Sequence, residues 1–449
     1  MDKDAIINNE HMFEEWIFKG NIVSIMMSGD IMTRKRTIMH IDVNSAYLSW
    51  QAVYDLQRGA DVDLRQIPSA VGGSQEDRRG IVLAKSIPAK AFGVQTGEVI
   101  WQAKQKCPGL VVVPPNYELY MKASNALYSL IKDYSPKVQR FSVDEMFLDY
   151  TGMEYFFGEP IEAAYKIKER VKEELGFTIN IGIGENKLTA KIAGDFKKPD
   201  MVHTLYQHEI PSKMWPLPVE DLFMVGRKTK KKLNDINIRT IGDLANTDTK
   251  FLYNKFKSFG YLLWQYANGI ENSPVSGSKI MNIKGIGNST TIRFDVEDKE
   301  TAFKVLLSLT ESVAMRLRAA KACCSIVSVE IRTSQLNSYS HQRKLFTPTC
   351  ITDEIYTVAA ELFEECWRGE KIRHLGVRVS QLSGDDFVQG TFFDDANREK
   401  KEALDYAIDC IRLKYGKTSI MRGALADGEI SPVSGGVGED DYVMMSSIL

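Results

Sequence analysis

The chain has 449 residues, of which 44% are hydrophobic and 26% are charged. This composition is that of a folded globular protein, and it excludes fibrous and largely disordered chains. A chain of this length is expected to divide into about two to four domains. No apolar run approaches the roughly 18 residues that a membrane span requires, so we expect no membrane partner.

The formal charges nearly balance, because 57 Lys and Arg residues stand against 59 Asp and Glu residues, for a net charge of -2. The balance is uneven along the chain. Residues 385–449 hold 7 basic and 13 acidic side chains, which leaves a mildly basic body before an acidic tail. The six cysteines lack the paired spacing of a zinc site, which favours reduced thiols and a cytoplasmic location.

The first elements place an acidic residue at the end of a strand. Residues 1–36 show no clear periodicity and have two interpretations: a non-native leader, with the true translation start at Met32, or a flexible arm. Ile38–Val43 alternates like a strand, and residues 45–56 have the pattern of a helix. Asp42 therefore lies where the strand ends. Residues 51–114 carry short strands and helices, which predict a small mixed subdomain.

A second acidic position lies in a turn. Residues 138–143 and 146–150 are expected to be strands on either side of Asp144 and Glu145. Most Asp-Glu turns are simply solvated, but hydrophobic residues flank this one, and buried carboxylates require a cationic partner. Mg²⁺ prefers oxygen ligands, and two such ions can clamp the attacking and leaving oxygens in phosphoryl transfer.

The remaining elements indicate further α+β layers. Helices expected at 161–175 and 186–195 enclose a strand at 178–183. Short helices follow from residue 208, and a capping box at 240–243 is typical of a helix-hairpin-helix unit. A linker at 272–278 precedes a second α+β domain, with strands expected at 290–294, 325–332 and 372–382 and helices at 299–320 and 353–367.

A last helix is expected from about Asn397. The residues Leu404, Ile408, Ile411 and Tyr415 lie on one face of this helix at a spacing typical of an amphipathic helix. Gly416 is well placed to end it.

Five ordered segments resemble the Y-family translesion DNA polymerases, including the bacterial DinB/UmuC branch. The resemblance runs from about residue 37 to 382 and implies a multidomain α+β right-hand polymerase. It implies a palm (37–50 and 115–207), small fingers (51–114), a helical thumb (208–276) and an α+β little finger (277–384). The segments are Ile41–Tyr47, Gly72–Gly73, Ala89–Val94, Phe141–Glu145 and Lys191–Pro199.

The resemblance assigns roles to several residues of the palm. Asp42, Asp144 and Glu145 match the catalytic carboxylates that hold two Mg²⁺ ions, with Mn²⁺ as a possible substitute. The main-chain carbonyl of Val43 matches a further metal ligand. Tyr47 matches the steric gate, an aromatic ring that leaves no room for the 2′-hydroxyl of a ribonucleotide.

Lys90 and Lys198 match positions that neutralise the triphosphate of the incoming nucleotide. The chain departs from the family pattern in the fingers, where Ile87 and Lys90 replace a common Tyr and Arg. Lys acts as a point charge and lacks the bidentate fork of Arg, which puts tight positioning of the triphosphate in doubt. Asn44 also replaces a frequent acid, although the metal site is expected to tolerate it.

Two further contacts are implied. Arg227, Lys228 and Lys230 surround the thumb hairpin, where helix N-termini and basic side chains suit sequence-independent binding to DNA phosphates. Met224 stands where a glycine is common, so the hairpin turn is expected to be altered.

In the tail, Gln389, Phe392 and Phe393 resemble the peptide that docks bacterial polymerases on the sliding clamp, the beta subunit. Packing of the two aromatic rings on the little finger or on the following helix is the alternative. The expected partners are thus primer-template DNA, dNTPs and the clamp, and the protein is expected to be a monomer.

Two functions stay open at this point. The first is template-directed, low-fidelity DNA synthesis across damaged DNA, by two-metal transfer of dNMP to a primer 3′-hydroxyl. The second is a catalytically weak or inactive DNA-binding or clamp-binding repair factor of the same fold, which Ile87 and Lys90 prompt. A nucleotide cyclase built on a related palm is disfavoured, because the turn lacks the GG(D/E)EF pattern.

Overall fold

The computed structural model describes residues 35–74, 76, 78, 80–276, 283–384, 397–416 and 418–426. Residues 1–34 of the expected leader (1–36) and the expected clamp-binding residues Gln389, Phe392 and Phe393 lie outside this part of the chain. Among the residues described, no helix is long and apolar enough to cross a membrane. All six cysteines are free thiols, as the sequence predicts.

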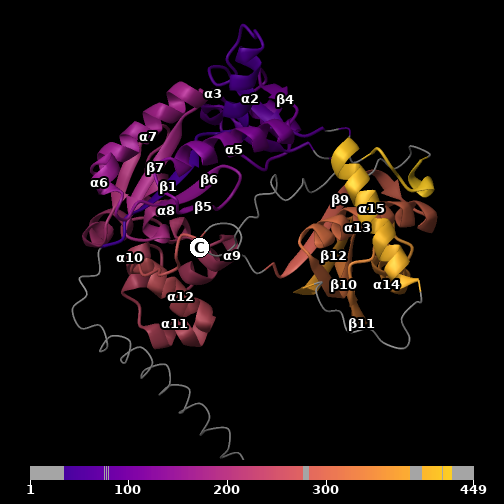
Figure 1. Cartoon of the computed structure of the whole chain (residues 1–449). Helices are drawn as coiled ribbons and strands as arrows, with labels where there is room; N and C mark the ends of the chain where they lie inside the picture. Colours follow the sequence, from indigo (N-terminus) through magenta and orange to yellow (C-terminus); the bar gives the residue numbers. More distant parts are fainter. Residues whose placement is uncertain are drawn as a thin grey trace, which may run out of the picture.

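A five-stranded sheet forms the first α+β layer, in the order β5-β6-β1-β7-β8 (Figure 1). Strand β1 lies in the middle and pairs antiparallel with both β6 and β7. Because strands flank it on both sides and helices cover both faces, all six residues of β1 are buried. The strands are β1 (Ile38–Val43), β5 (Val138–Arg140), β6 (Glu145–Asp149), β7 (Ile179–Gly184) and β8 (Val202–Leu205).

The two faces of this sheet pack against different helices. Met39 and Ile41 belong to the core shared with α2 (Ala46–Gln57), α5 (Tyr117–Lys132) and α7 (Pro160–Leu175), whereas Ile38 faces the opposite core. Helix α8 (Lys187–Asp195) covers that second face. It approaches so closely that a Cβ at Gly182 would lie 2.0 Å from the Ala190 carbonyl oxygen. Only glycine therefore allows α8 to lie against the sheet here.

The expected small subdomain follows α2. Its sheet has three strands in the order β3-β2-β4, and two short helices accompany them. The short strand β4 was not among the expected elements. The elements are β2 (Ser69–Gly72), β3 (Val82–Lys85), α3 (Ile87–Ala91), α4 (Ile100–Lys106) and β4 (Val111–Val113).

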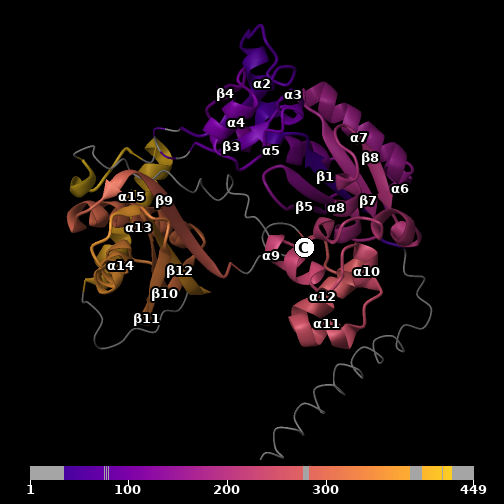
Figure 2. The same cartoon turned by 180° about the vertical axis from the view of Figure 1, so that it is seen from behind.

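Short helices form the next unit: α9 (Arg227–Asn234), α10 (Ile241–Ala245), α11 (Thr249–Phe256) and α12 (Ser258–Ala267). Figure 2 shows α11 and α12 at the end of this unit that is farther from the five-stranded sheet. The expected capping box at the start of α10 is confirmed. Met224 has a φ of 74°, so a methionine adopts the left-handed conformation that a glycine would take, at a cost of roughly 1–2 kcal/mol.

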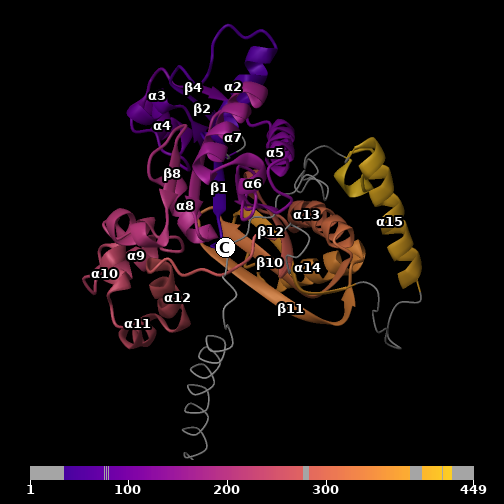
Figure 3. The same cartoon turned by 60° about the vertical axis from the view of Figure 1, so that its left-hand side comes forward.

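The second α+β domain is a four-stranded sheet in the order β11-β10-β12-β9. Two helices cover one of its faces, and a third, α15 (Arg398–Tyr415), lies outside them (Figure 3). Strand β11 was not expected from the sequence. The other elements are β9 (Gly285–Val296), α13 (Lys299–Ala319), β10 (Ala322–Thr333), β11 (Ser338–Thr349), α14 (Thr352–Cys366) and β12 (Ile372–Gly384).

Helix α15 docks through charged side chains. Its predicted apolar face is largely exposed, since Leu404 and Tyr415 retain 59% and 67% of their accessible surface. The buried residues of α15 include Asp405 and Asp409. The Arg318 side chain of α13 lies 2.7 Å from Asp409 and 3.1 Å from Asp405. The amphipathic pattern therefore predicted the helix but not the face that contacts the domain.

Candidate active site

Two of the predicted carboxylates lie side by side on neighbouring strands. Asp42 is the fifth residue of β1 and faces Glu145, the first residue of β6. Directly opposed residues of antiparallel strands share a face of the sheet, and this is the face that α8 covers. The side chain of Asp42 is 10% exposed and that of Glu145 is 21% exposed. The two carboxylates therefore lie mostly buried at one end of the central strands, where water still reaches them.

Asp144 completes the acidic group from the turn before β6. The Val43 N–H donates to the Asp144 carbonyl at 3.1 Å, which ties this turn to the end of β1. The Ser142 hydroxyl donates to the Asp144 carboxylate at 2.5 Å. Burial raises the pKa of Asp144 above its ordinary value, and the charges of Asp42 and Glu145 raise it further against the effect of Ser142. This carboxylate lacks a cationic side-chain partner among the described residues.

Glu145 is held by a lysine from α8. The Lys191 ammonium donates to both carboxylate oxygens of Glu145, at 2.8 and 2.7 Å. The imidazole Nε2 of His40 lies 3.6 Å from the same carboxylate, which is longer than a hydrogen bond. Burial alone would raise the pKa of Glu145, but His40 and Lys191 lower it to about 2.

Lys198 follows α8 and binds two acids. Its ammonium donates to Asp42 at 2.5 Å and lies 2.8 Å from Asp195. Burial works to lower the pKa of Lys198, but the two carboxylates raise it above its ordinary value. The lysine expected to meet the triphosphate therefore neutralises a candidate metal ligand in this structure.

Lysine side chains bind two of the three acids in this structure. In the part of the chain that the structure describes, no three Asp, Glu, His or Cys side chains converge closely enough to enclose a metal ion. The ammonium groups of Lys191 and Lys198 lie where cations would bind Glu145 and Asp42. The residues nevertheless fit a divalent ion, because they are hard oxygen donors and Asp144 is a partly buried carboxylate that lacks a cationic side-chain partner among the described residues.

Asn44 supports this arrangement without an acidic side chain. Its side-chain oxygen accepts from the Thr178 hydroxyl at 3.0 Å and from the Asp200 N–H at 2.9 Å. Its amide donates to Asn180 at 3.1 Å. Asn44 therefore fixes the end of β1 to β7 and to the segment that carries Lys198.

Tyr47 lies beside the carboxylates at the start of α2. Its ring stacks on Tyr120, with centroids 4.6 Å apart and planes at 10°, and meets the edge of Tyr117. Burial, followed by the nearby charge of Asp144, raises the pKa of Tyr47 to about 12. The ring is thus held rigidly by its neighbours, with its hydroxyl neutral at ordinary pH.

The small three-stranded subdomain brings two lysines together. Lys90 is exposed on α3, and Lys85 on β3 is partly buried. Burial lowers the pKa of Lys85, and the charge of Lys90 lowers it further. Ile87, at the position where the resemblance implies a tyrosine, is 58% exposed. An anion would relieve the repulsion between the two ammonium groups.

The three basic residues predicted to bind DNA all lie on α9. Arg227 and Lys228 are exposed on its first turn, next to the Val225–Gly226 turn. Lys230 instead binds the Glu220 carboxylate. Arg227 and Lys228 are therefore better placed than Lys230 to meet a phosphate.

Sequence comparison identifies the family. The sequence model of the impB/mucB/samB family matches residues 41–195, and that of its C-terminal domain matches residues 283–392. The helix-hairpin-helix motif of the same family matches residues 208–238. Together these matches cover more than half of the chain.

Curated relatives match over nearly their whole length. DNA polymerase IV of Clostridium acetobutylicum is 47% identical over 398 residues, which is 88% of this chain and 99% of the relative. The chain belongs to the Y-family DNA polymerases. DNA polymerase IV of Acetivibrio thermocellus is 42% identical, over 87% of this chain and 98% of the relative. The polymerase is thus a DNA-directed DNA polymerase by family, and the family's fold implies dependence on divalent metal.

The fold agrees with solved structures. A Y-family chimera built on Dbh superposes with a TM-score of 0.66 at 22% identity, over 77% of the polymerase and 99% of the chimera. An insertion ternary complex of Dbh DNA polymerase superposes with a TM-score of 0.54 over 77% of the polymerase and 98% of that chain, also at 22% identity. The predicted α+β right-hand architecture with a C-terminal little finger is confirmed.

Sequence reasoning did not assign roles to some residues that shape the polymerase site. Lys191 lay inside a recognised motif, yet nothing in the local pattern showed that it reaches Glu145 across the sheet. Ser142 precedes the acids by two residues, a spacing that favours a side-chain bond to the local backbone, and it could have been noted. The position of His40 beside Glu145 follows only from strand pairing.

Replacing Lys191 with methionine is expected to strengthen binding of divalent metal in the absence of DNA and nucleotide. The substitution removes a competing cation from Glu145, and loss of one unit charge at this distance should tighten binding roughly tenfold. Isothermal titration with Mn²⁺ measures the effect. Lys187→Met is the matched control, because Lys187 is also buried on α8 but donates to Gln139. Equal affinities for the two variants would contradict the prediction.

Proposed function

We propose that the polymerase copies damaged DNA by two-metal nucleotidyl transfer. The observation that carries the proposal is the grouping of Asp42, Asp144 and Glu145 at one end of the palm sheet, with the Tyr47 ring beside them. In the reaction the primer 3′-hydroxyl attacks the α-phosphorus of a dNTP, and the bond to pyrophosphate breaks. The palm, fingers, thumb and little finger have the proposed limits 37–50 with 115–207, 51–114, 208–276 and 277–384.

Asp42, Asp144 and Glu145, with the Val43 carbonyl, would hold two Mg²⁺ ions, for which Mn²⁺ is a substitute. Bound divalent ions would lower the pKa of the attacking hydroxyl and would stabilise the negative charge on the leaving oxygen. The chain's own contribution is to hold the carboxylates in place through strand pairing and Ser142. Lys198, whose ammonium donates to Asp42 in this structure, would bind the triphosphate when a metal takes the place of that ammonium on the carboxylate.

The fingers would supply the other contacts to the nucleotide. Lys90, with the adjacent Lys85, provides positive charge for the triphosphate but no bidentate fork. Beyond the end of α2, the described residues of this subdomain form three short strands and two short helices. So small a cover encloses the nascent base pair loosely, which supports low fidelity and tolerance of distorted templates.

Lesion bypass is tested by running-start primer extension through a single abasic site. The expected result is insertion opposite the site and extension past it, with Mg²⁺ and all four dNTPs. Extension that halts one nucleotide before the abasic site, on a template whose undamaged version is copied fully, would contradict lesion bypass while leaving polymerase activity intact.

The proposed steric gate gives a second test. Tyr47→Ala is expected to raise incorporation of ribonucleotides relative to deoxyribonucleotides by about a hundredfold, because the ring that meets a 2′-hydroxyl is removed. Single-nucleotide kinetics with paired dNTP and rNTP substrates measure the ratio. Tyr47→Phe keeps the ring and is the control, and it should discriminate like the intact polymerase. An unchanged ratio in Tyr47→Ala would rule out the gate.

We also propose that Gln389, Phe392 and Phe393 dock the polymerase on the sliding clamp as a monomer. The support is their position between two anchored elements, because β12 ends at Gly384 and α15, bound to α13, begins at Arg398. Phe392→Ala with Phe393→Ala is expected to abolish stimulation of primer extension by the clamp. Leu413→Ala, which removes an exposed apolar side chain of α15, should retain it.

The alternative is a DNA-binding or clamp-binding factor with little catalysis. Ile87 and Lys90 favour it, because the fingers lack both the tyrosine hydroxyl and the guanidinium of the common motif. Substituting Ile87→Tyr together with Lys90→Arg separates the two functions. A large gain in extension would show that these positions limit catalysis in the native chain, whereas efficient extension without the changes would exclude the alternative.

A further inference from the structure

One buried side chain beside the candidate acids has no hydrogen-bond partner. His40 lies on β1 and is 1% exposed, yet neither of its ring nitrogens forms a hydrogen bond with the described residues. A buried polar group without a partner destabilises the fold, so an apolar side chain would pack here at lower cost. Packing alone therefore does not explain a histidine at this position, and a second state of the site, in which the imidazole has a partner, does.

The sheet places His40 beside Glu145. Residues two apart on a strand share a face, so His40 and Asp42 lie on the same face of β1. His40 pairs with Phe147 across the strands, as Asp42 pairs with Glu145, which makes His40 and Glu145 diagonal neighbours. The Nε2 atom of His40 lies 3.6 Å from a Glu145 carboxylate oxygen. A hydrogen bond is roughly 2.7–3.2 Å long, so a small shift would form one.

The imidazole is confined, whereas the carboxylate has room to adjust. The His40 ring packs against Phe147, with the ring centroids 4.9 Å apart. It also lies close to α8, because a Cβ at Gly194 would be 3.1 Å from His40 Nδ1. The Glu145 side chain is 21% exposed, and Lys191 donates to both of its oxygens. Glu145 is therefore the side chain that would move, once the Lys191 ammonium no longer holds it.

We propose that His40 is a positioning residue for Glu145. With a metal in place of the Lys191 ammonium, the Nε2–H of His40 donates to the Glu145 carboxylate and fixes its orientation as a ligand. This inference rests on the metal-binding role of Glu145 in the proposed function. Among the described residues, Lys191 and His40 are the side chains that interact with this carboxylate, so His40 remains when Lys191 is displaced. Hydrogen bonds of this kind typically contribute roughly ten- to a hundredfold to metal affinity.

The test combines calorimetric titration of the DNA-free polymerase with Mn²⁺ and thermal unfolding. His40→Phe keeps a ring of similar shape but loses the donor, so it should bind Mn²⁺ roughly tenfold more weakly. The same variant should unfold at an equal or higher temperature, because it removes a buried polar group without a partner. His374→Phe, on β12 of the little finger, is the control and should keep full Mn²⁺ affinity.

Two amide variants test whether the reach of the donor matters. The side-chain nitrogen of glutamine can take the place of Nε2, whereas that of asparagine extends only as far as Nδ1. His40→Gln should therefore recover most of the Mn²⁺ affinity, and His40→Asn should not. In primer extension, His40→Phe should need about tenfold more Mg²⁺ for the half-maximal rate. Its rate at saturating Mg²⁺ should stay within a few-fold of the intact polymerase.

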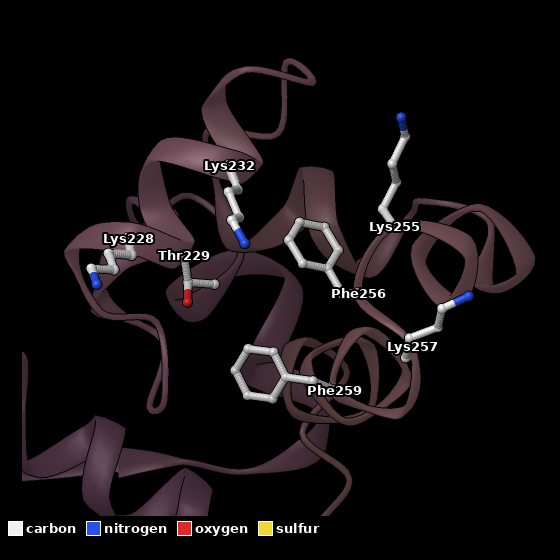
Figure 4. A pocket seen from close by; sticks show the side chains of 7 residues that line it. All are labelled: Lys228, Thr229, Lys232, Lys255, Phe256, Lys257 and Phe259. Carbon is white, nitrogen blue, oxygen red and sulfur yellow. The ribbon is translucent and has the colours of Figure 1, made fainter. Parts of the chain in front are cut away.

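Binding of primer-template without metal is measured on the same variants and should not change. Basic side chains that can meet phosphates lie on other elements, such as Lys228 and Lys255 around the hollow between α9 and the turn that joins α11 to α12 (Figure 4). Equal Mn²⁺ affinity in His40→Phe and the intact polymerase, or equal losses in the Gln and Asn variants, would overturn the positioning role. Failure of the intact polymerase to bind Mn²⁺, even with primer-template and dNTP, would instead overturn the proposed metal site, and the inference with it.

Discussion

Asp144→Asn is expected to reduce primer extension roughly a thousandfold or more, with little loss of DNA affinity. The substitution keeps the shape of the side chain but removes a negative oxygen ligand, and metal-derived charge stabilisation is worth several kcal/mol in the transition state. Of the three candidate acids, Asp144 is the one that has no cationic side-chain partner among the described residues. Its negative charge is therefore the one most directly available to a metal ion. Single-turnover extension at saturating DNA and dNTP measures the loss.

The matched control is Asp149→Asn, at the other end of β6. Asp149 lies near Lys137 at the strand's far end, so its replacement removes an equal charge from the same sheet. Its extension rate should stay within a few-fold of the intact polymerase. Comparable losses in both variants would show that Asp144 acts through the stability of the sheet and not through metal.

Arg318→Met is expected to destabilise the little finger by about 3–5 kcal/mol, because it leaves two buried carboxylates without their cation. Arg318 also donates to the Cys350 carbonyl at 2.8 Å. Asp405 in turn accepts from the Thr352 N–H at 2.7 Å, at the start of α14. Amide hydrogen exchange should show faster opening of α15 and of the first turn of α14 in the variant.

Two controls separate this network from ordinary surface pairs. Arg343→Met removes an arginine that binds Glu361 and Glu365 in a more exposed setting, and it should cost about 1 kcal/mol or less. Adding Asp405→Asn and Asp409→Asn to Arg318→Met removes the uncompensated charges and should recover much of the stability. Unchanged exchange in Arg318→Met would contradict docking of α15 by ion pairs.

The case of α15 shows where sequence patterns stop being informative. The spacing of Leu404, Ile408, Ile411 and Tyr415 predicted a helix with one apolar face, and Gly416 ends it as predicted. The pattern could not show which face meets the domain, because that depends on Arg318, about ninety residues earlier. Strand β11 was missed for a related reason. Most of its residues are polar and solvent-accessible, so they lack the alternation that marks a half-buried strand.

The sequence predicted where the candidate acids lie in the strands and turns, but not which side chains would contact them. Alternation located Asp42 at the end of a strand, and two flanking strands located Asp144 and Glu145 at a turn. The register that pairs Asp42 with Glu145 depends on how the strands associate in the sheet, so the local sequence could not show it. The reach of Lys191 depends further on the close approach of α8 that Gly182 permits. Roles such as the steric gate came from family resemblance and not from residue patterns.

The most direct test of the proposed chemistry is single-nucleotide extension of an undamaged primer-template by the intact chain with Mg²⁺. The expected product is a primer longer by one template-complementary nucleotide, with release of pyrophosphate and no extension when the metal is chelated. Tight binding of the primer-template with no extension, in either Mg²⁺ or Mn²⁺, would contradict nucleotidyl transfer and leave a DNA-binding factor with the fold of a polymerase.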